Sequence, residues 1–228
     1  MPESLCLRTI LDEAARDVFP PADGRVTVVR QPSPRDAGVV AFTAHSVVFT
    51  DEDPEWVRRT LERAGCDALA APMNPRFLAA FMDRTGRTND TVDLLAVAPS
   101  LTGEPALPLV EVTDRDHHRV VRAREHRDDV RVWTVDGGVL VLGRGVAGRL
   151  EAGVEVDAAV RHRGLGRELA GAARRLAGGE PVWAQLAPGN ARSVRAFLAA
   201  GYRAVGAEAL LTERRKATAA GEVTAEGA

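Results

Sequence analysis

Two neighbouring segments near residue 160 show different kinds of hydrophobic periodicity. The first has an apolar residue at every second position: Leu150, Ala152, Val154 and Val156. That alternation is typical of a strand with one buried face. The second has small or apolar residues at helical spacing: Leu165, Leu169, Ala172, Ala173 and Leu176. The pattern predicts a strand that turns directly into a helix with one apolar side.

A second strand and helix are predicted further along the chain. Residues 181–186 form a short apolar run that ends at Pro188-Gly189-Asn190. Asn190 is a favourable N-cap for a helix of about ten residues, and Gly201 suits the left-handed position that ends a helix. A last strand is predicted over 204–211.

The first hundred residues predict a mixture of helices and strands. An amphipathic helix over 7–19 ends at Pro20-Pro21, and a second helix starts after the acidic corner Thr50-Asp51-Glu52-Asp53-Pro54. Between the two helices the pattern predicts three short strands: 26–29, 39–43 and 47–50.

A linker with several turn-forming residues divides the chain. Because residues 99–106 are rich in Pro, Gly, Ser and Thr, we place a boundary there, giving units of 1–106 and 107–214. The second unit begins with a strand over 109–112, a cap at Thr113, a charged helix over 114–127 and a hairpin through Asp136-Gly137-Gly138. Residues 215–228 are small and polar and are expected to be a disordered tail.

Composition excludes several classes of function. The chain has 228 residues, 45% of them hydrophobic, a net charge of −2 and only 4% aromatic residues. It is long enough for one large core or two small ones, and it lacks the basic charge and the aromatic platforms that nucleic-acid binding requires. The excess of arginine over lysine and the many alanines suggest a GC-rich bacterial genome.

Two cysteines and the start of the sequence bear on location. Cys6 and Cys66 are far apart and lack metal-ligand partners nearby, so we expect free thiols in a reducing compartment. The first residues lack a basic region, and no apolar run reaches membrane length. We therefore expect a soluble cytoplasmic protein that contacts neither a membrane nor nucleic acid.

A run of histidine and arginine on the predicted charged helix has two readings. Its members are His117, His118, Arg119, Arg122, Arg124 and His126. They are either a solvated helix face or a contact surface for an acidic acceptor. Zinc is not expected there, because carboxylate or cysteine partners at ligand spacing are missing.

The turn between the strand and the helix near residue 160 has the composition of an anion site. Arg161-His162-Arg163-Gly164-Leu165-Gly166 opens the helix, where backbone N–H groups lack partners and two glycines allow a ligand to approach. A dinucleotide fingerprint needs a third glycine, and a Walker loop needs a lysine, whereas the only lysine here is Lys216. We expect the turn to bind a pyrophosphate.

These residues resemble the acyl-CoA-binding signature of the GCN5-related N-acetyltransferase (GNAT) family, Gln/Arg-x-x-Gly-x-Gly/Ala. The downstream order of strand, Asn190, short helix, Gly201-Tyr202 and last strand is also similar to the family. The resemblance implies an α/β (α+β) fold, with a mixed β-sheet splayed between its central strands and flanked by helices. Acyl-CoA would enter that splay.

The N-terminal half contains an echo of the Asn190 segment. Asn74, Phe81 and Gly86 are spaced like Asn190, Phe197 and Gly201. Residues 1–106 are therefore either a degenerate GNAT-like copy or a strand-helix unit that is alike by chance. Under both readings this half lacks the anion turn, and it would shape the acceptor site or a dimer contact.

The resemblance also assigns site residues. The backbone of Val154, Glu155 and Val156 would bind the pantetheine arm, with an N–H near Val156 stabilising the oxyanion. The N–H groups of the corner, with the arginines among these residues, would bind the pyrophosphate: Arg161, His162, Arg163, Gly164, Leu165, Gly166 and Arg167. Asn190, Ser193 and position 197 would contact the cofactor arm.

The sequence departs from the family at the acid and base positions. The tyrosine that often protonates the leaving thiolate is replaced by Phe197, and an acid used by some members is replaced by Gln185. Tyr202 has the position of a packing residue. The remaining candidate base is Glu151, acting through water, with Glu155 on the same strand face.

Two functions follow from the resemblance. The first is an acetyl-CoA-dependent N-acetyltransferase that acts on a primary amine of a small molecule or peptide by direct attack, without a metal. The second is a non-catalytic sensor or scaffold that binds acyl-CoA. The acceptor and the oligomeric state, including a homodimer, stay open.

Overall fold

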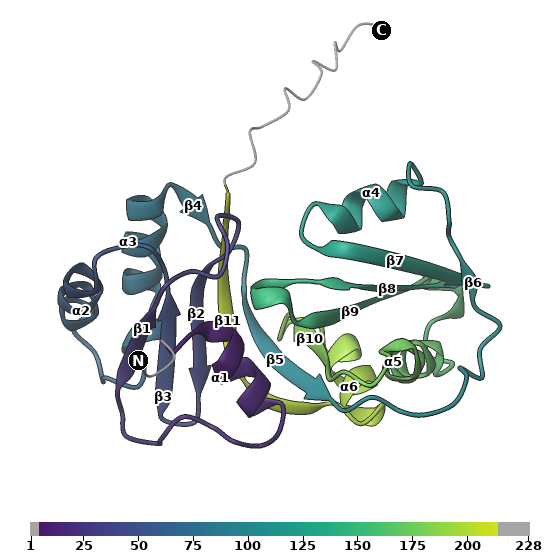
Figure 1. Cartoon of the computed structure of the whole chain (residues 1–228), viewed down its shortest axis with the longest axis horizontal. Coiled ribbons are helices and arrows are strands. Elements are labelled where there is room, and N and C mark those ends of the chain that lie inside the picture. The colour runs from purple at the N-terminus through teal and green to yellow at the C-terminus, as the bar shows by residue number, and fades with distance from the viewer. Residues whose placement is uncertain (1–4, 214–228) are drawn as a thin grey trace, which may run out of the picture.

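The computed structural model describes residues 5–213, which form one extended sheet with helices on both faces (Figure 1). The expected tail over 215–228 lies outside the described residues. The helices are α1 Leu7–Ala14, α2 Pro54–Arg63, α3 Pro75–Thr85, α4 His118–Arg124, α5 Leu165–Leu176 and α6 Ala191–Ala199. The strands are β1 Val26–Val29, β2 Ala37–Phe42, β3 His45–Phe49, β4 Arg87–Thr88, β5 Val92–Ala98, β6 Val110–Glu111, β7 Asp128–Val135, β8 Gly138–Arg144, β9 Leu150–Val156, β10 Val182–Leu186 and β11 Arg203–Glu213.

The sheet is mixed. Its strand order is β1-β3-β2-β11-β5-β10-β9-β8-β7-β6, and β4 pairs with β11 outside this path. The pairs β1/β3 and β9/β10 are parallel, and the other pairs are antiparallel. The predicted fold class, a mixed sheet flanked by helices, is confirmed.

The two halves of the chain exchange neighbours in the middle of the sheet. β5 comes from the first half, yet it lies between β10 and β11 of the second half. β11 in turn pairs with β2 through Ala207–Leu211. Figure 1 shows β5 and β11 side by side at the centre of the molecule. The sheet is therefore continuous across the predicted boundary at residue 106, and the division into units remains a prediction.

The alternation of side chains along β5 separates the two faces of the sheet. Ala96 and Ala98 pack in the cluster that includes α5 and α6, and Val92 packs with α2 and α3. Leu95 and Val97 pack in the cluster that includes α1. Four helices therefore cover one face, while α1 covers the other, and α4 packs on β7 and β8 through Val120.

Three predicted boundaries differ from the structure. α1 ends at Ala14 instead of residue 19, because Asp17 takes a left-handed conformation at φ 65°. The charged helix starts at His118 instead of 114, since the Asp114 carboxylate accepts from the Asp116 N–H and forms a turn. The last strand, β11, covers Arg203–Glu213 instead of 204–211, because its end also pairs with β4 through Thr212 and Glu213.

The elements around the predicted anion turn follow the sequence closely. β9, α5, β10 and α6 lie where the periodicity predicts them. Asn190 caps α6 by accepting from the Ser193 N–H at 3.2 Å, and Gly201 has a φ of 88°. Asn74 and Gly86 have the same roles in α3, although the proposed repeat stays a prediction.

Candidate functional site

β9 and β10 separate after two pairs of residues. Their parallel pairing joins Leu150 to Val182 and Glu151 to Trp183, and the register goes no further. β9 continues to Val156 while pairing only with β8. An opening between the central strands therefore lies along the second half of β9, as the resemblance implied.

The hydrogen-bond pattern of β9 turns part of its backbone toward this opening. The N–H of Asp157 donates to the carbonyl of Gly137 at 2.9 Å, one position beyond the pairing of Val156 with Gly138. Because such bonds alternate along an antiparallel ladder, the N–H groups of Val154 and Val156 point away from β8. They therefore face the side from which β10 has diverged.

The corner that follows β9 leaves its amides exposed. Gly164 is the N-cap of α5, with a φ of 91° and no side chain to accept from the first turn. The first backbone bonds of the helix run from Arg167 and Glu168 to the Gly164 carbonyl, at 3.0 and 3.1 Å. No hydrogen bond within residues 5–213 is donated by the N–H groups of 162–166. These groups can bind an anion at the positive end of the helix dipole.

A cleft of about 830 Å³, here called the corner cleft, lies between β9, α5 and α6. Its lining combines apolar, polar and charged residues: Val154, Glu155, Val156, Asp157, Ala158, Val160, Arg161, His162, Gly164, Leu165, Gly166, Arg167, Asn190, Arg192, Ser193, Arg195 and Ala196. Its volume lies within the range typical of sites for cofactor-sized ligands. A methyl group at Gly166 would lie 3.6 Å from both Val156 and Ala196, so the glycine keeps the cleft open.

The corner cleft carries excess positive charge. Four arginines line it against the two carboxylates of Glu155 and Asp157. Arg161 donates to the Val156 carbonyl at 3.2 Å, and Glu155 is paired with Arg119. Arg167, Arg192 and Arg195 have no hydrogen bond or ion pair to any described residue. These three side chains can therefore reorient toward phosphate groups.

The structure brings most of the predicted site residues together. The lining includes Val154, Glu155, Val156, Arg161, His162, Gly164, Leu165, Gly166, Arg167, Asn190 and Ser193. Arg163, although adjacent in sequence, does not line the cleft. Phe197 and Glu151 are absent from the lining too, each for a structural reason.

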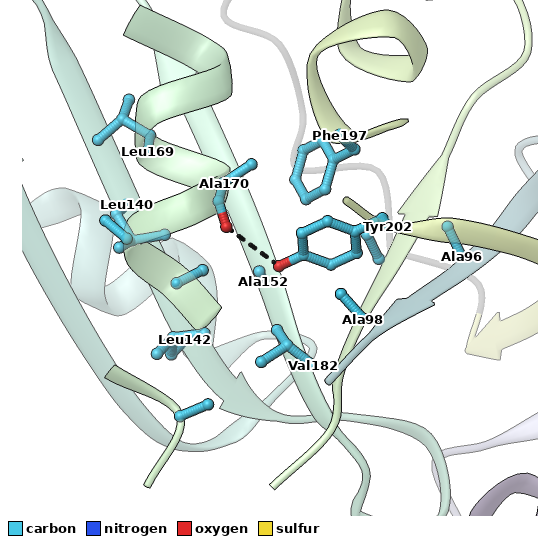
Figure 2. Close-up of a cluster of buried hydrophobic side chains, with 14 of the residues drawn as sticks. Ala96, Ala98, Leu140, Leu142, Ala152, Leu169, Ala170, Val182, Phe197 and Tyr202 are labelled. Atoms are coloured by element: carbon cyan, nitrogen blue, oxygen red, sulfur yellow. Dashed lines mark hydrogen bonds between the residues drawn. The ribbon is translucent and has the colours of Figure 1, made fainter. Parts of the chain in front are cut away.

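Phe197 belongs to the hydrophobic core (Figure 2). Its ring lies against the Tyr202 ring with the centroids 4.9 Å apart, and it is only 2% exposed. The Tyr202 hydroxyl donates to the Ala170 carbonyl at 3.4 Å, and burial raises the pKa of this phenol above its ordinary value. Both rings pack between α5, α6 and the sheet. Phe197 is therefore a core residue and not the predicted cofactor contact.

Glu151 lies in a buried ion-pair cluster. Its carboxylate accepts from Arg149 Nε at 2.8 Å, Arg127 Nε at 3.1 Å and the Val146 N–H at 3.3 Å. Burial alone favours the neutral acid, but the Arg149 and Arg127 charges and these hydrogen bonds outweigh it and lower the pKa of Glu151. A fully engaged carboxylate with a low proton affinity is a poor general base. The structure therefore argues against the predicted base role.

Two of the arginines that line the cleft were missed by the sequence analysis. Arg192 and Arg195 follow Asn190 at the start of α6 and line the cleft opposite the α5 corner. Their nearness in sequence to the Asn190 motif was the available signal. The packing of α6 against α5 places these two arginines at the cleft, and the sequence alone does not show that packing.

Among residues 5–213, no group of three or more His, Cys, Asp or Glu side chains could hold a metal ion. No helix in the same part of the chain is both long and apolar enough to span a membrane.

Comparisons of the sequence alone give no match, either to protein-family models or to curated proteins. Three bacterial proteins are among the solved structures with a similar fold. A structure from Novosphingobium aromaticivorans that is provisionally described as an acetyltransferase of the GNAT family has 19% identity and a TM-score of 0.39, over 57% of this chain and 68% of its own. A GCN5-related N-acetyltransferase from Kribbella flavida has 16% identity and a TM-score of 0.43, over 90% and 93% of the two chains. One from Sphaerobacter thermophilus has 13% identity and a TM-score of 0.36, over 60% and 56%.

All three structures bear the name of the family that the sequence motifs resemble.

Proposed function

We propose that this protein is an acyl-CoA-dependent N-acyltransferase. It transfers acetyl from acetyl-CoA to a primary amine of a small molecule or peptide by direct attack. The observation that supports this most is the corner cleft. Unengaged N–H groups of 162–166, three unpaired arginines and the outward-facing backbone of β9 meet there around one opening.

Each part of the cleft suits a different part of coenzyme A. The helix N-terminus and the arginines offer donors and positive charge to the pyrophosphate. Val154, Val156, Leu165 and Ala196 offer an apolar wall to the pantetheine arm. The backbone N–H of Val156 faces the opening and can donate to the thioester oxygen as negative charge develops on it.

Catalysis in this proposal depends mainly on positioning. The amine attacks the thioester carbonyl carbon, the C–N bond forms and the C–S bond breaks. The acceptor ammonium loses one proton to water before the attack. As the amide forms, the nitrogen loses a second proton, which ends on the departing thiolate. Holding both substrates in the opening between β9 and β10 supplies most of the rate enhancement.

Two measurements test the proposal. Acetyl-CoA is first added to the purified protein, and a rise in Tm is expected because the ligand binds only the folded state. Thiol release is then followed with a panel of primary amines, and at least one amine is expected to be acetylated. If acetyl-CoA binds but no amine causes thiol release, the result favours the non-catalytic sensor that binds acyl-CoA. If acetyl-CoA does not raise Tm, the result contradicts both the transferase and the sensor.

A further inference from the structure

One carboxylate near the centre of the sheet lacks a partner. Oδ1 of Asp93 is buried and makes no hydrogen bond to any described residue. Asp93 is the second residue of β5 and lies directly opposite Glu208 of β11. Buried polar atoms are nearly always hydrogen-bonded, so an unmet carboxylate oxygen in this position indicates a missing partner.

The arginine that pairs with Glu208, the residue opposite Asp93 in the sheet, is already engaged. Arg149 donates both terminal nitrogens to Glu208, at 3.0 and 2.7 Å, and its Nε to Glu151. The Gln185 amide also donates to Glu208. Burial raises the pKa of Asp93 to about 6, and the nearby carboxylates of Glu208 and Asp90 add to that shift. The surroundings therefore leave negative charge uncompensated.

Asp93 lies at the open end of the divergence between β9 and β10. In the antiparallel pairing of β5 with β10, Leu94 is opposite Leu186, the last residue of β10. Asp93 is thus level with the end of β10, beyond the point where β9 has separated. Its side chain shares the face of Leu95, opposite to the face covered by α5 and α6. An acceptor that approaches from that face would meet Asp93.

We propose that Asp93 binds a positively charged group of the acceptor. The inference rests on the proposed function, since it places the acceptor on the face opposite α5 and α6. Paired strands lie about 4.8 Å apart, so β5 is at least about 10 Å from β9, and the distance is larger where β9 has separated from β10. The backbone of β9 is the part that would receive the thioester. The amine that attacks the thioester at β9 therefore cannot also be the group that Asp93 binds. Asp93 binds a second cationic group of the acceptor, which a spacer separates from the reacting amine. Diamines and peptides with two amino groups have this chemistry.

A matched pair of acceptors tests the inference. 1,5-Diaminopentane and 5-aminopentan-1-ol have the same length and differ by one positive charge. The wild-type protein is expected to favour the diamine by at least about tenfold in kcat/KM, as expected for a charge-assisted hydrogen bond. Asp93→Asn is expected to abolish that preference by raising KM for the diamine, with little change in kcat for either acceptor. Asp90→Asn, which removes an exposed neighbouring carboxylate, is the control.

Binding measurements keep the test independent of turnover. Titration calorimetry of both amines into the CoA-loaded protein should show tighter binding of the diamine, lost in Asp93→Asn. Equal affinity for the two amines, no binding of either, or an unchanged preference in the variant would overturn the inference. If the wild-type protein does not bind acetyl-CoA, that result contradicts the proposed function and not the role of Asp93. The diamine can then still be titrated into the free protein.

A ligand-free measurement gives a second readout. Because the folded-state pKa of Asp93 is raised, its charge destabilises the folded protein at pH values above that pKa, and the penalty shrinks as pH falls toward the unfolded value. Asp93→Asn should therefore raise Tm at about pH 8 and less at about pH 5. An unchanged or lower Tm at the higher pH would mean that Asp93 has a partner and is not poised for a cation.

Discussion

Two of the strand-to-helix corners of the chain differ in how the start of the helix is satisfied. In the first, β3 leads into α2 through an acidic segment. Asp53 Oδ1 accepts from the Glu55 N–H at 3.0 Å, and Thr50 Oγ1 accepts from the Glu52 N–H at 3.1 Å. In the second, β9 leads into α5, where Gly164 provides no side chain and the amides stay open.

The comparison shows that a strand-to-helix corner can either satisfy its own N–H groups, as a structural cap, or leave them free to bind a ligand. The acidic corner supplies its own anions, and Glu52 is further paired with Arg84 at 2.8 Å. The basic corner lacks internal anions for its amides, and unpaired arginines surround it. A helix start without a cap has N–H groups that lack hydrogen-bond acceptors. We therefore expect a bound anion to accept hydrogen bonds from the N–H groups at the start of α5 and to stabilise the helix.

The strongest test of this contrast supplies an anion to the basic corner. Gly164→Glu adds bulk and negative charge there, and it is expected to abolish the rise in Tm given by acetyl-CoA. Gly178→Glu is the matched control, since it has the same charge change, also at a positive φ, in open space beyond α5. It should keep the full rise in Tm. Equal responses of the two variants would mean that acetyl-CoA binds elsewhere.

A smaller effect is expected from the arginines around the corner. Arg167→Ala removes a side chain that lines the cleft, and it should weaken acetyl-CoA binding about tenfold, as expected for one charged hydrogen bond. Arg163→Ala removes a neighbouring charge outside the lining and should change the Kd by less than about twofold. Calorimetry at two salt concentrations measures both. A larger loss of affinity in Arg163→Ala than in Arg167→Ala would mean that Arg163 does contact the pyrophosphate, as the sequence alone predicted.

The smallest effect separates capping from binding. Asp53→Ala and Asn190→Ala each remove an N-cap, and each should lower the unfolding free energy by about 1 kcal/mol. In a chain of this size the corresponding fall in Tm is about 2–4 °C. Only Asn190→Ala should also weaken acetyl-CoA binding, because Asn190 lines the corner cleft. Weaker binding in Asp53→Ala would indicate that the two corners are coupled.

The corner cleft was predictable to the extent that its residues are consecutive. Gly164, the amides around it and the Asn190 cap follow from local rules of helix termini. Arg192 and Arg195 needed the packing of α6 on α5. Glu151 was misjudged because an alternating strand pattern identifies a face, whereas the partners on that face come from elsewhere in the chain. Arg127 and Arg149 are those partners.

The sequence by itself determined β9, α5, β10, α6 and the caps of the last helix, because hydrophobic periodicity and turn chemistry act over a few residues. Only the tertiary structure decided that β5 lies between β10 and β11, that Phe197 is buried in the core, and that Asp93 lies opposite Glu208 with its Oδ1 unpartnered within residues 5–213. Strand neighbours are chosen by pairing and packing over the whole chain, and these long-range interactions leave no local pattern in the sequence.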